Sequence, residues 1–153
     1  MTDFSPTRRG LLFCIGALVV GSTYGAWVYT HPQPANGTPV LSVQEAHRAA
    51  LEGRILLIDI RRPDEWARTG IGVGALPLDM RRPDFIAALD RIAAGDPTRA
   101  VALICARGVR SARLTNRLAQ AGFTNTIDVP EGMQGSGAGP GWLAKGLPVL
   151  AAP

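Results

Sequence analysis

The stretch VALICARGVRS, residues 101–111, decides the fold of this 153-residue chain. Its first four residues are apolar, which predicts a buried strand over Ala100–Ile104. Apolar residues then recur at helical spacing, which predicts a helix over Ser111–Gln120. Cys105 is therefore expected at the carboxyl end of a strand, where a short loop leads into the N-terminus of a helix.

The loop after Cys105 has the composition of a site that binds an anion and activates a thiol. Successive backbone N–H groups and the positive end of the helix dipole would point at one place there. Two arginines add positive charge, so a thiolate is favoured without a separate general base. A buried structural cysteine is the alternative, but it does not account for the arginines and the glycine. The residues predicted to form this cradle are Ala106, Arg107, Gly108, Val109, Arg110 and Ser111.

Composition narrows the classes of function. The net charge of +4 is scattered and not interleaved with aromatic residues, which argues against nucleic-acid binding and favours small anionic substrates. One of the two cysteines, Cys14, lies in an apolar leader, so the globular part has a single thiol and no internal disulfide. His31 and His47 show no ligand spacing, and we expect no metal and no cofactor.

The N-terminal segment resembles a twin-arginine export signal, because Arg8 and Arg9 directly precede the uncharged stretch Gly10–Thr30. That stretch is also long enough to cross a bilayer. We therefore predict an export signal or membrane anchor over residues 1–30 and a linker over 31–39. The sequence does not decide between a cleaved signal and a retained anchor. The domain would then lie in the bacterial periplasm, soluble after cleavage or anchored to the inner membrane. A soluble protein with a buried N-terminal helix is disfavoured by the uniformly apolar run.

The remaining chain alternates strands with helices, which predicts an α/β domain on a mainly parallel sheet. Ligands of such sheets bind beyond the carboxyl ends of the strands, where Cys105 falls. We expect turns at the glycine-rich segments Gly70–Gly74 and Glu131–Gly141. The predicted strands are Arg54–Ile60, Ala75–Leu78, Ala100–Ile104 and Thr126–Val129, and the predicted helices are Val43–Leu51, a short one from Arg62, Pro83–Ala94, Ser111–Gln120 and a last one ending near Gly146.

Five short motifs in order make residues 40–150 similar to a single-domain rhodanese, a sulfurtransferase-type module. They are Asp59-Ile60-Arg61 with Pro63–Trp66, Gly70–Ala75, Cys105–Ser111, Gly122-Phe123, and a closing pattern of Glu131-Gly132-Met133, Trp142 and Gly146-Leu147-Pro148. The histidine usual after the first glycine of the second motif is Ile71 here. The resemblance implies an α/β fold whose mainly parallel central sheet is flanked by helices on both faces.

The resemblance also implies a chemistry. Cys105 would take sulfane sulfur from a small anionic donor such as thiosulfate, hold it as a persulfide, and pass it to a thiophilic acceptor such as cyanide or a thiol. Arg110 would contact the donor or brace the loop against an acidic partner, and Arg107 would recruit a dianion or simply carry surface charge. Asp59 and Arg61 would form a supporting ion pair at a strand end.

Three other functions fit parts of the pattern. A phosphatase of the cell-cycle type uses a similar loop with one more residue between cysteine and arginine, whereas only Ala106–Val109 intervene here. A non-enzymatic sulfur carrier or partner-binding module would load sulfur but transfer it slowly. A thiol sensor would instead respond to oxidation of the same thiol, which has a low pKa and is exposed to oxidants outside the cytoplasm.

Overall fold

The structure is a computed structural model that describes residues 37–152. The predicted export segment, residues 1–30, and most of the predicted linker lie outside the described residues. In the part of the chain that is described, none of the helices combines the length and the hydropathy needed to cross a membrane.

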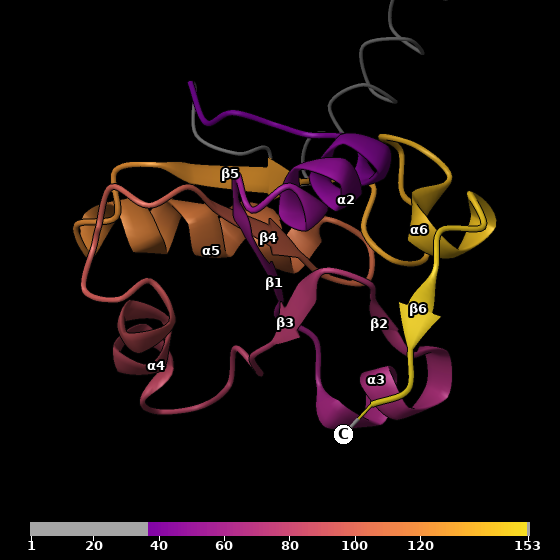
Figure 1. Cartoon of the computed structure of the whole chain (residues 1–153), viewed down its shortest axis with the longest axis horizontal. Coiled ribbons are helices and arrows are strands. Elements are labelled where there is room, and N and C mark those ends of the chain that lie inside the picture. Colours follow the sequence, from indigo (N-terminus) through magenta and orange to yellow (C-terminus); the bar gives the residue numbers. More distant parts are fainter. Residues whose placement is uncertain (1–36, 153) are drawn as a thin grey trace, which may run out of the picture. The chain divides into compact units, whose positions relative to one another are not determined.

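A four-stranded parallel sheet forms the centre of the domain, in the order β3-β1-β4-β5 (Figure 1). The central strands β1 (Leu56–Asp59) and β4 (Val101–Ile104) are almost entirely buried. They are flanked by β3 (Ala75–Pro77) and β5 (Thr126–Val129). Continuous apolar runs suit such strands because both faces of a parallel sheet are covered.

Helices cover the sheet on both faces, as predicted for this fold class. On one face, α2 (Val43–Leu51) and α6 (Gly141–Ala144) pack against side chains of β1, β4 and β5. On the other, α4 (Phe85–Ile92) and α5 (Val109–Gln120) enclose a second apolar cluster that includes Cys105. The cysteine therefore belongs to the face covered by α5.

Beyond the central sheet, α3 (Pro63–Thr69) is followed by a small antiparallel pair, β2 (Ile71–Gly72) and β6 (Val149–Leu150). Figure 1 shows this pair next to α3. The predicted turn in the glycine-rich segment after α3 is present at Val73 and Gly74, whereas the strand Ile71–Gly72 before it was not predicted. A two-residue strand has too few positions for a periodic signal, and its partner lies at the other end of the domain.

The remaining predicted elements are present, two with the predicted bounds and the others with shorter or shifted ends. The helix Val43–Leu51 begins as expected, with Ser42 and Glu45 forming a capping box. Helix α5 begins at Val109, earlier than predicted, because Gly108 adopts a left-handed conformation (φ +78°) and already turns the chain into the helix. The helix therefore starts inside the loop that carries the chemistry.

Candidate active site

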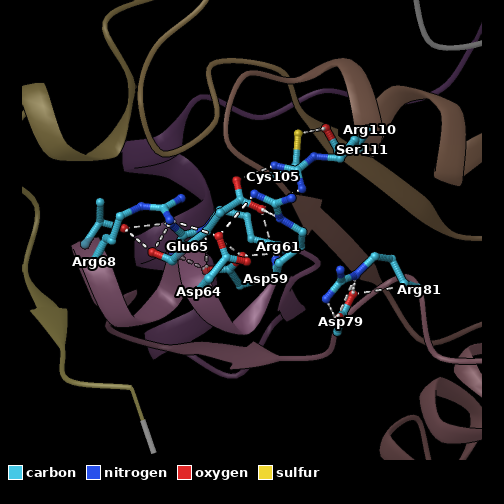
Figure 2. Close-up of polar contacts among 12 residues, drawn as sticks. Asp59, Arg61, Asp64, Glu65, Arg68, Asp79, Arg81, Cys105, Arg110 and Ser111 are labelled. Carbon is cyan, nitrogen blue, oxygen red and sulfur yellow. Dashed lines mark hydrogen bonds and ion pairs between the residues drawn. The ribbon is translucent and has the colours of Figure 1, made fainter.

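Cys105 follows β4 directly, and its side chain points to the first turn of α5 (Figure 2). The Cys105 Sγ lies 3.7 Å from the Ser111 Oγ, within the hydrogen-bonding distance of a thiol. Both residues are buried, and Cys105 is only 1% exposed. The loop thus folds back around its own sulfur, which is shielded from bulk water.

Neighbouring backbone holds the loop in place. The carbonyl oxygens of Cys105 and Ala106 accept hydrogen bonds from the N–H groups of Met133 and Gln134, both at 2.8 Å. Gly108 has no room for a side chain, because a Cβ there would overlap the Pro130 backbone. These contacts occupy two of the loop's carbonyl groups and restrict its curvature.

The N–H groups of the loop are left unoccupied. Within residues 37–152, none of the backbone N–H groups of residues 106–111 donates a hydrogen bond to another atom. They belong to the loop and to the first turn of α5, where the helix dipole is positive. Free donors at a helix N-terminus beside a sulfur atom form a cradle for an anion.

Arg110 is fixed by an acidic partner. Its guanidinium forms a bidentate ion pair with the Glu65 carboxylate, at 2.7 and 2.6 Å. The pair holds the pKa of Glu65 at about 2, chiefly through the hydrogen bonds from Arg110. The same hydrogen bonds raise the pKa of Arg110, and attraction to Cys105 adds to the effect. Arg110 therefore lies between the carboxylate and the sulfur.

Glu65 is a site residue that the sequence analysis did not identify. It lies in the first turn of α3 and its Oε2 also accepts a hydrogen bond from the Arg62 N–H at 3.1 Å. Its side chain is only 8% exposed. The one available signal was its position in the motif Pro63–Trp66, which does not by itself show what a carboxylate there contacts.

Asp59 and Arg61 form a fully buried ion pair at the end of β1, with the Arg61 Nη2 2.7 Å from the Asp59 Oδ2. Arg61 also donates to the Thr69 hydroxyl and the Gly70 carbonyl, each at 2.7 Å. These bonds tie β1 to the end of α3. The pair orders the loop beside the site, and neither residue lines the pocket described next.

A pocket of about 380 Å³ opens beside the active loop. Three of its lining side chains are arginines and one is a carboxylate, so its lining is positive. Arg81 is in turn held by Asp79 (2.6 Å), as Figure 2 shows. Of the predicted loop residues only Arg110 reaches the pocket, whereas Arg107 is exposed. The lining residues are Arg62, Glu65, Met80, Arg81 and Arg110.

Metal ligands are not assembled in the described part of the chain. No group of three or more His, Cys, Asp or Glu side chains there is close enough together to hold an ion. His47, which shows no ligand spacing in the sequence, has its Nδ1 2.9 Å from the Val73 carbonyl oxygen and packs edge-on against Trp142. It connects α2 with the segment that follows β2.

The chain belongs to the rhodanese-like domain family. The family match covers residues 42–137, which include the sheet, the active loop and α5. None of the curated proteins matches the sequence significantly.

Solved structures show the same fold. A polysulfide-sulfur transferase homodimer from Wolinella succinogenes is 26% identical, with a TM-score of 0.61 over 85% of this chain and 88% of that one. A thiosulfate sulfurtransferase from Pseudomonas aeruginosa is 25% identical (TM-score 0.58), over 77% of this chain but only 21% of that chain. A rhodanese-like domain protein from Staphylococcus aureus is 23% identical (TM-score 0.52), over 74% of this chain and 99% of that one.

Proposed function

We propose that this protein is a sulfurtransferase that moves sulfane sulfur from a small anionic donor to a thiophilic acceptor through a persulfide on Cys105. The observation that carries the proposal is a buried cysteine sulfur at the start of a loop whose N–H groups, residues 106–111, donate no hydrogen bond within the described residues. A persulfide is an anion one sulfur atom longer than a thiolate, and such donors stabilise it. The similarity to two sulfurtransferases supports the same function.

The reaction has two balanced steps. The Cys105 thiolate attacks the terminal sulfur of the donor, the donor's S–S bond breaks, and the remainder leaves with the bonding electron pair, as sulfite does from thiosulfate. The acceptor then attacks the outer sulfur of the persulfide, and the Cys105 thiolate leaves. Both steps exchange one S–S bond for another bond to sulfur, so no external oxidant or reductant is required.

The pocket beside the loop supports an anionic donor. Its guanidinium groups outnumber its carboxylate, and Arg110 is placed between the pocket and Cys105. The 1% exposure of Cys105 favours attack on a small terminal sulfur atom over attack on a bulky group. The short interval Ala106–Val109 likewise favours sulfur over a phosphoryl group.

Turnover with two substrates tests the proposal. The full chain is incubated with thiosulfate or inorganic polysulfide plus cyanide, and thiocyanate release is measured. We expect catalytic release that Cys105→Ser abolishes and that Cys14→Ser, the matched control at the other thiol, leaves unchanged. Release that persists in Cys105→Ser contradicts the proposal. Sulfur loading on Cys105 without catalytic transfer identifies the protein as a carrier instead.

A further inference from the structure

Asp128 is a buried carboxylate that the chemistry above does not use. It lies on β5, where its neighbours Ile127 and Val129 face the α2 side of the sheet. Because side chains alternate along a strand, Asp128 faces the other side, toward α5. Its exposed fraction is 0%, and neither carboxylate oxygen has a hydrogen-bond partner among the described residues. Such a group is costly to keep charged without a function.

Ser111 connects this carboxylate with the active sulfur. Its hydroxyl is fully buried and accepts a hydrogen bond from the Cys105 Sγ at 3.7 Å. It is also the one side chain that lowers the pKa of Asp128 against the effect of burial, although the hydroxyl is turned to another acceptor in the structure. In the structure the hydroxyl donates to the Gly108 carbonyl oxygen at 2.9 Å, so a relay through Ser111 requires the hydroxyl hydrogen to turn from that acceptor to Asp128.

Few other charges act on Asp128. The sheet-facing residues of α5 are uncharged, its Arg113 and Arg117 are exposed, and Arg110 is held by Glu65 next to Cys105. The neighbouring strand β4 is apolar, and the segment 39–41 that pairs with Asp128 carries no charge. Burial therefore dominates and raises the pKa of Asp128 to about 6. Within residues 37–152, Cys105 is the titratable group that hydrogen-bonds to Ser111, the side chain that acts on Asp128.

We propose that Asp128 is the proton acceptor for the Cys105 thiol, with the Ser111 hydroxyl as the relay between them. The Cys105 S–H proton passes to the Ser111 oxygen while the Ser111 O–H proton passes to the Asp128 carboxylate. The products are a thiolate and a carboxylic acid, and the site's net charge is unchanged. The sulfur is activated without releasing a proton into a buried site.

This relay deepens the proposed function, on which its role in catalysis rests. It also changes one expectation, because the N–H cradle alone was expected to generate the thiolate. Moving the proton along the relay, instead of releasing it, keeps a single negative charge in the buried site. A base whose pKa lies near the working pH is also effective for proton transfer.

The pH dependence of Cys105 alkylation tests the relay without any sulfur donor. The full chain is treated with iodoacetamide at pH values from about 5 to about 10, a range that spans the titration of an ordinary thiol. Modification of the Cys105 peptide is followed by mass spectrometry. For the wild type we expect a two-step profile whose first step is centred near the pH at which Asp128 titrates. Asp128→Asn and Ser111→Ala lose that first step and converge with the wild type at the alkaline end.

Thr115→Ala is the matched control, because Thr115 is a second buried hydroxyl on the same face of α5 that donates to the Ala112 carbonyl oxygen. It should keep the two-step profile. A wild-type profile in both Asp128→Asn and Ser111→Ala overturns the relay, and Ser111→Ala decides alone if Asp128→Asn does not fold. Absence of thiocyanate release alongside a two-step profile overturns the sulfurtransferase function and leaves the relay standing.

Discussion

Arg110 and Glu65 show how one pair of side chains connects the active loop with a distant part of the chain. Arg110 begins α5 with a cation, which opposes the helix dipole. The bidentate contact with a nearly buried carboxylate compensates for that position. The guanidinium is thereby held at the edge of the pocket, where its charge also acts on Cys105.

Replacing Glu65 with glutamine should therefore destabilise the protein. We expect a loss of roughly 2 kcal/mol at pH 7, because the partly buried Arg110 is left without its counter-charge. The pKa of Glu65 is lowered to about 2 in the folded state, so its contribution is complete above its ordinary value of 4.5 and is lost as the pH falls toward 2. Urea unfolding at several pH values measures this.

Asp64→Asn is the control, since Asp64 is the neighbouring carboxylate and is 51% exposed in its ion pairs with Arg62 and Arg68. It should cost less than about 1 kcal/mol. Equal losses in the two variants, or a Glu65→Gln loss that is independent of pH, would contradict the bracing role.

For Asp128 we predict the opposite dependence of stability on pH. Its pKa is raised from 3.8 to about 6 on folding, so the native state binds the proton more tightly and stability falls as the pH rises through this range. This difference in pKa corresponds to a loss of about 3 kcal/mol in the free energy of unfolding at pH 7. We expect Asp128→Asn to be more stable than the wild type at pH 7 by up to this amount, and the gain to vanish below pH 4. Thermal unfolding at pH 4 and 7 measures it; a gain that is the same at both pH values rules out a buried titrating carboxylate.

At the scale of elements, the site is made by the junction of β4 and α5 with the segment that follows β5. Gly108 turns the chain into α5 and contacts the Pro130 backbone, while Gly132 lies against the Ala106 carbonyl group. Backbone packs directly on backbone at both places. The curvature of the loop, and hence the direction of its N–H groups, depends on these two close approaches.

Gly108→Ala should therefore damage both folding and activity. The added Cβ is strained at φ +78° and overlaps Pro130, and we expect a cost of roughly 3 kcal/mol or more with loss of sulfur transfer. Gly122→Ala is the matched control, because Gly122 has φ +96° but nothing within 4 Å of the added atom. It should cost only about 1–2 kcal/mol and keep activity. Similar activity in the two variants would contradict the importance of loop curvature.

Much of this arrangement is predictable from the sequence. The strand before Cys105 and the helix after it follow from apolar periodicity, and they place the thiol at a helix N-terminus. The helix Val43–Leu51 and the strand Thr126–Val129 have the predicted bounds. These elements are long or flanked by clear caps and turns, which is where local signals are strongest.

The contacts between elements are not predictable in this way. Glu65 and Arg110 are far apart in the sequence, and no periodic pattern connects them. Asp128 looks like an ordinary polar residue in a strand until the sheet places it beneath α5. Tertiary packing decides both, so the pocket and the relay become visible only in three dimensions.

At the scale of the whole molecule, the chain joins a rhodanese-like domain to an N-terminal segment that lies outside the described residues. The paired arginines Arg8 and Arg9 before Gly10–Thr30 still predict export of the folded domain. Export would place a reactive thiol in an oxidising compartment, where burial of Cys105 protects it from over-oxidation.

Replacing both Arg8 and Arg9 with lysine should keep the protein in the cytoplasm, because twin-arginine export depends on recognition of the guanidinium pair itself. Cell fractionation followed by immunoblotting measures this. Replacing Arg48 and Arg54, two arginines of the folded domain outside the pocket, is the control and should leave export unchanged. Normal translocation of the Arg8→Lys, Arg9→Lys variant would show that another route is used.

The most direct measurement is the intact mass of the full chain after brief exposure to thiosulfate or polysulfide and removal of excess donor. The account predicts a gain of one sulfur atom, located on the Cys105 peptide, released by cyanide and absent from Cys105→Ser. An unchanged mass with both donors, or a sulfur that is carried by Cys14 instead, would contradict it.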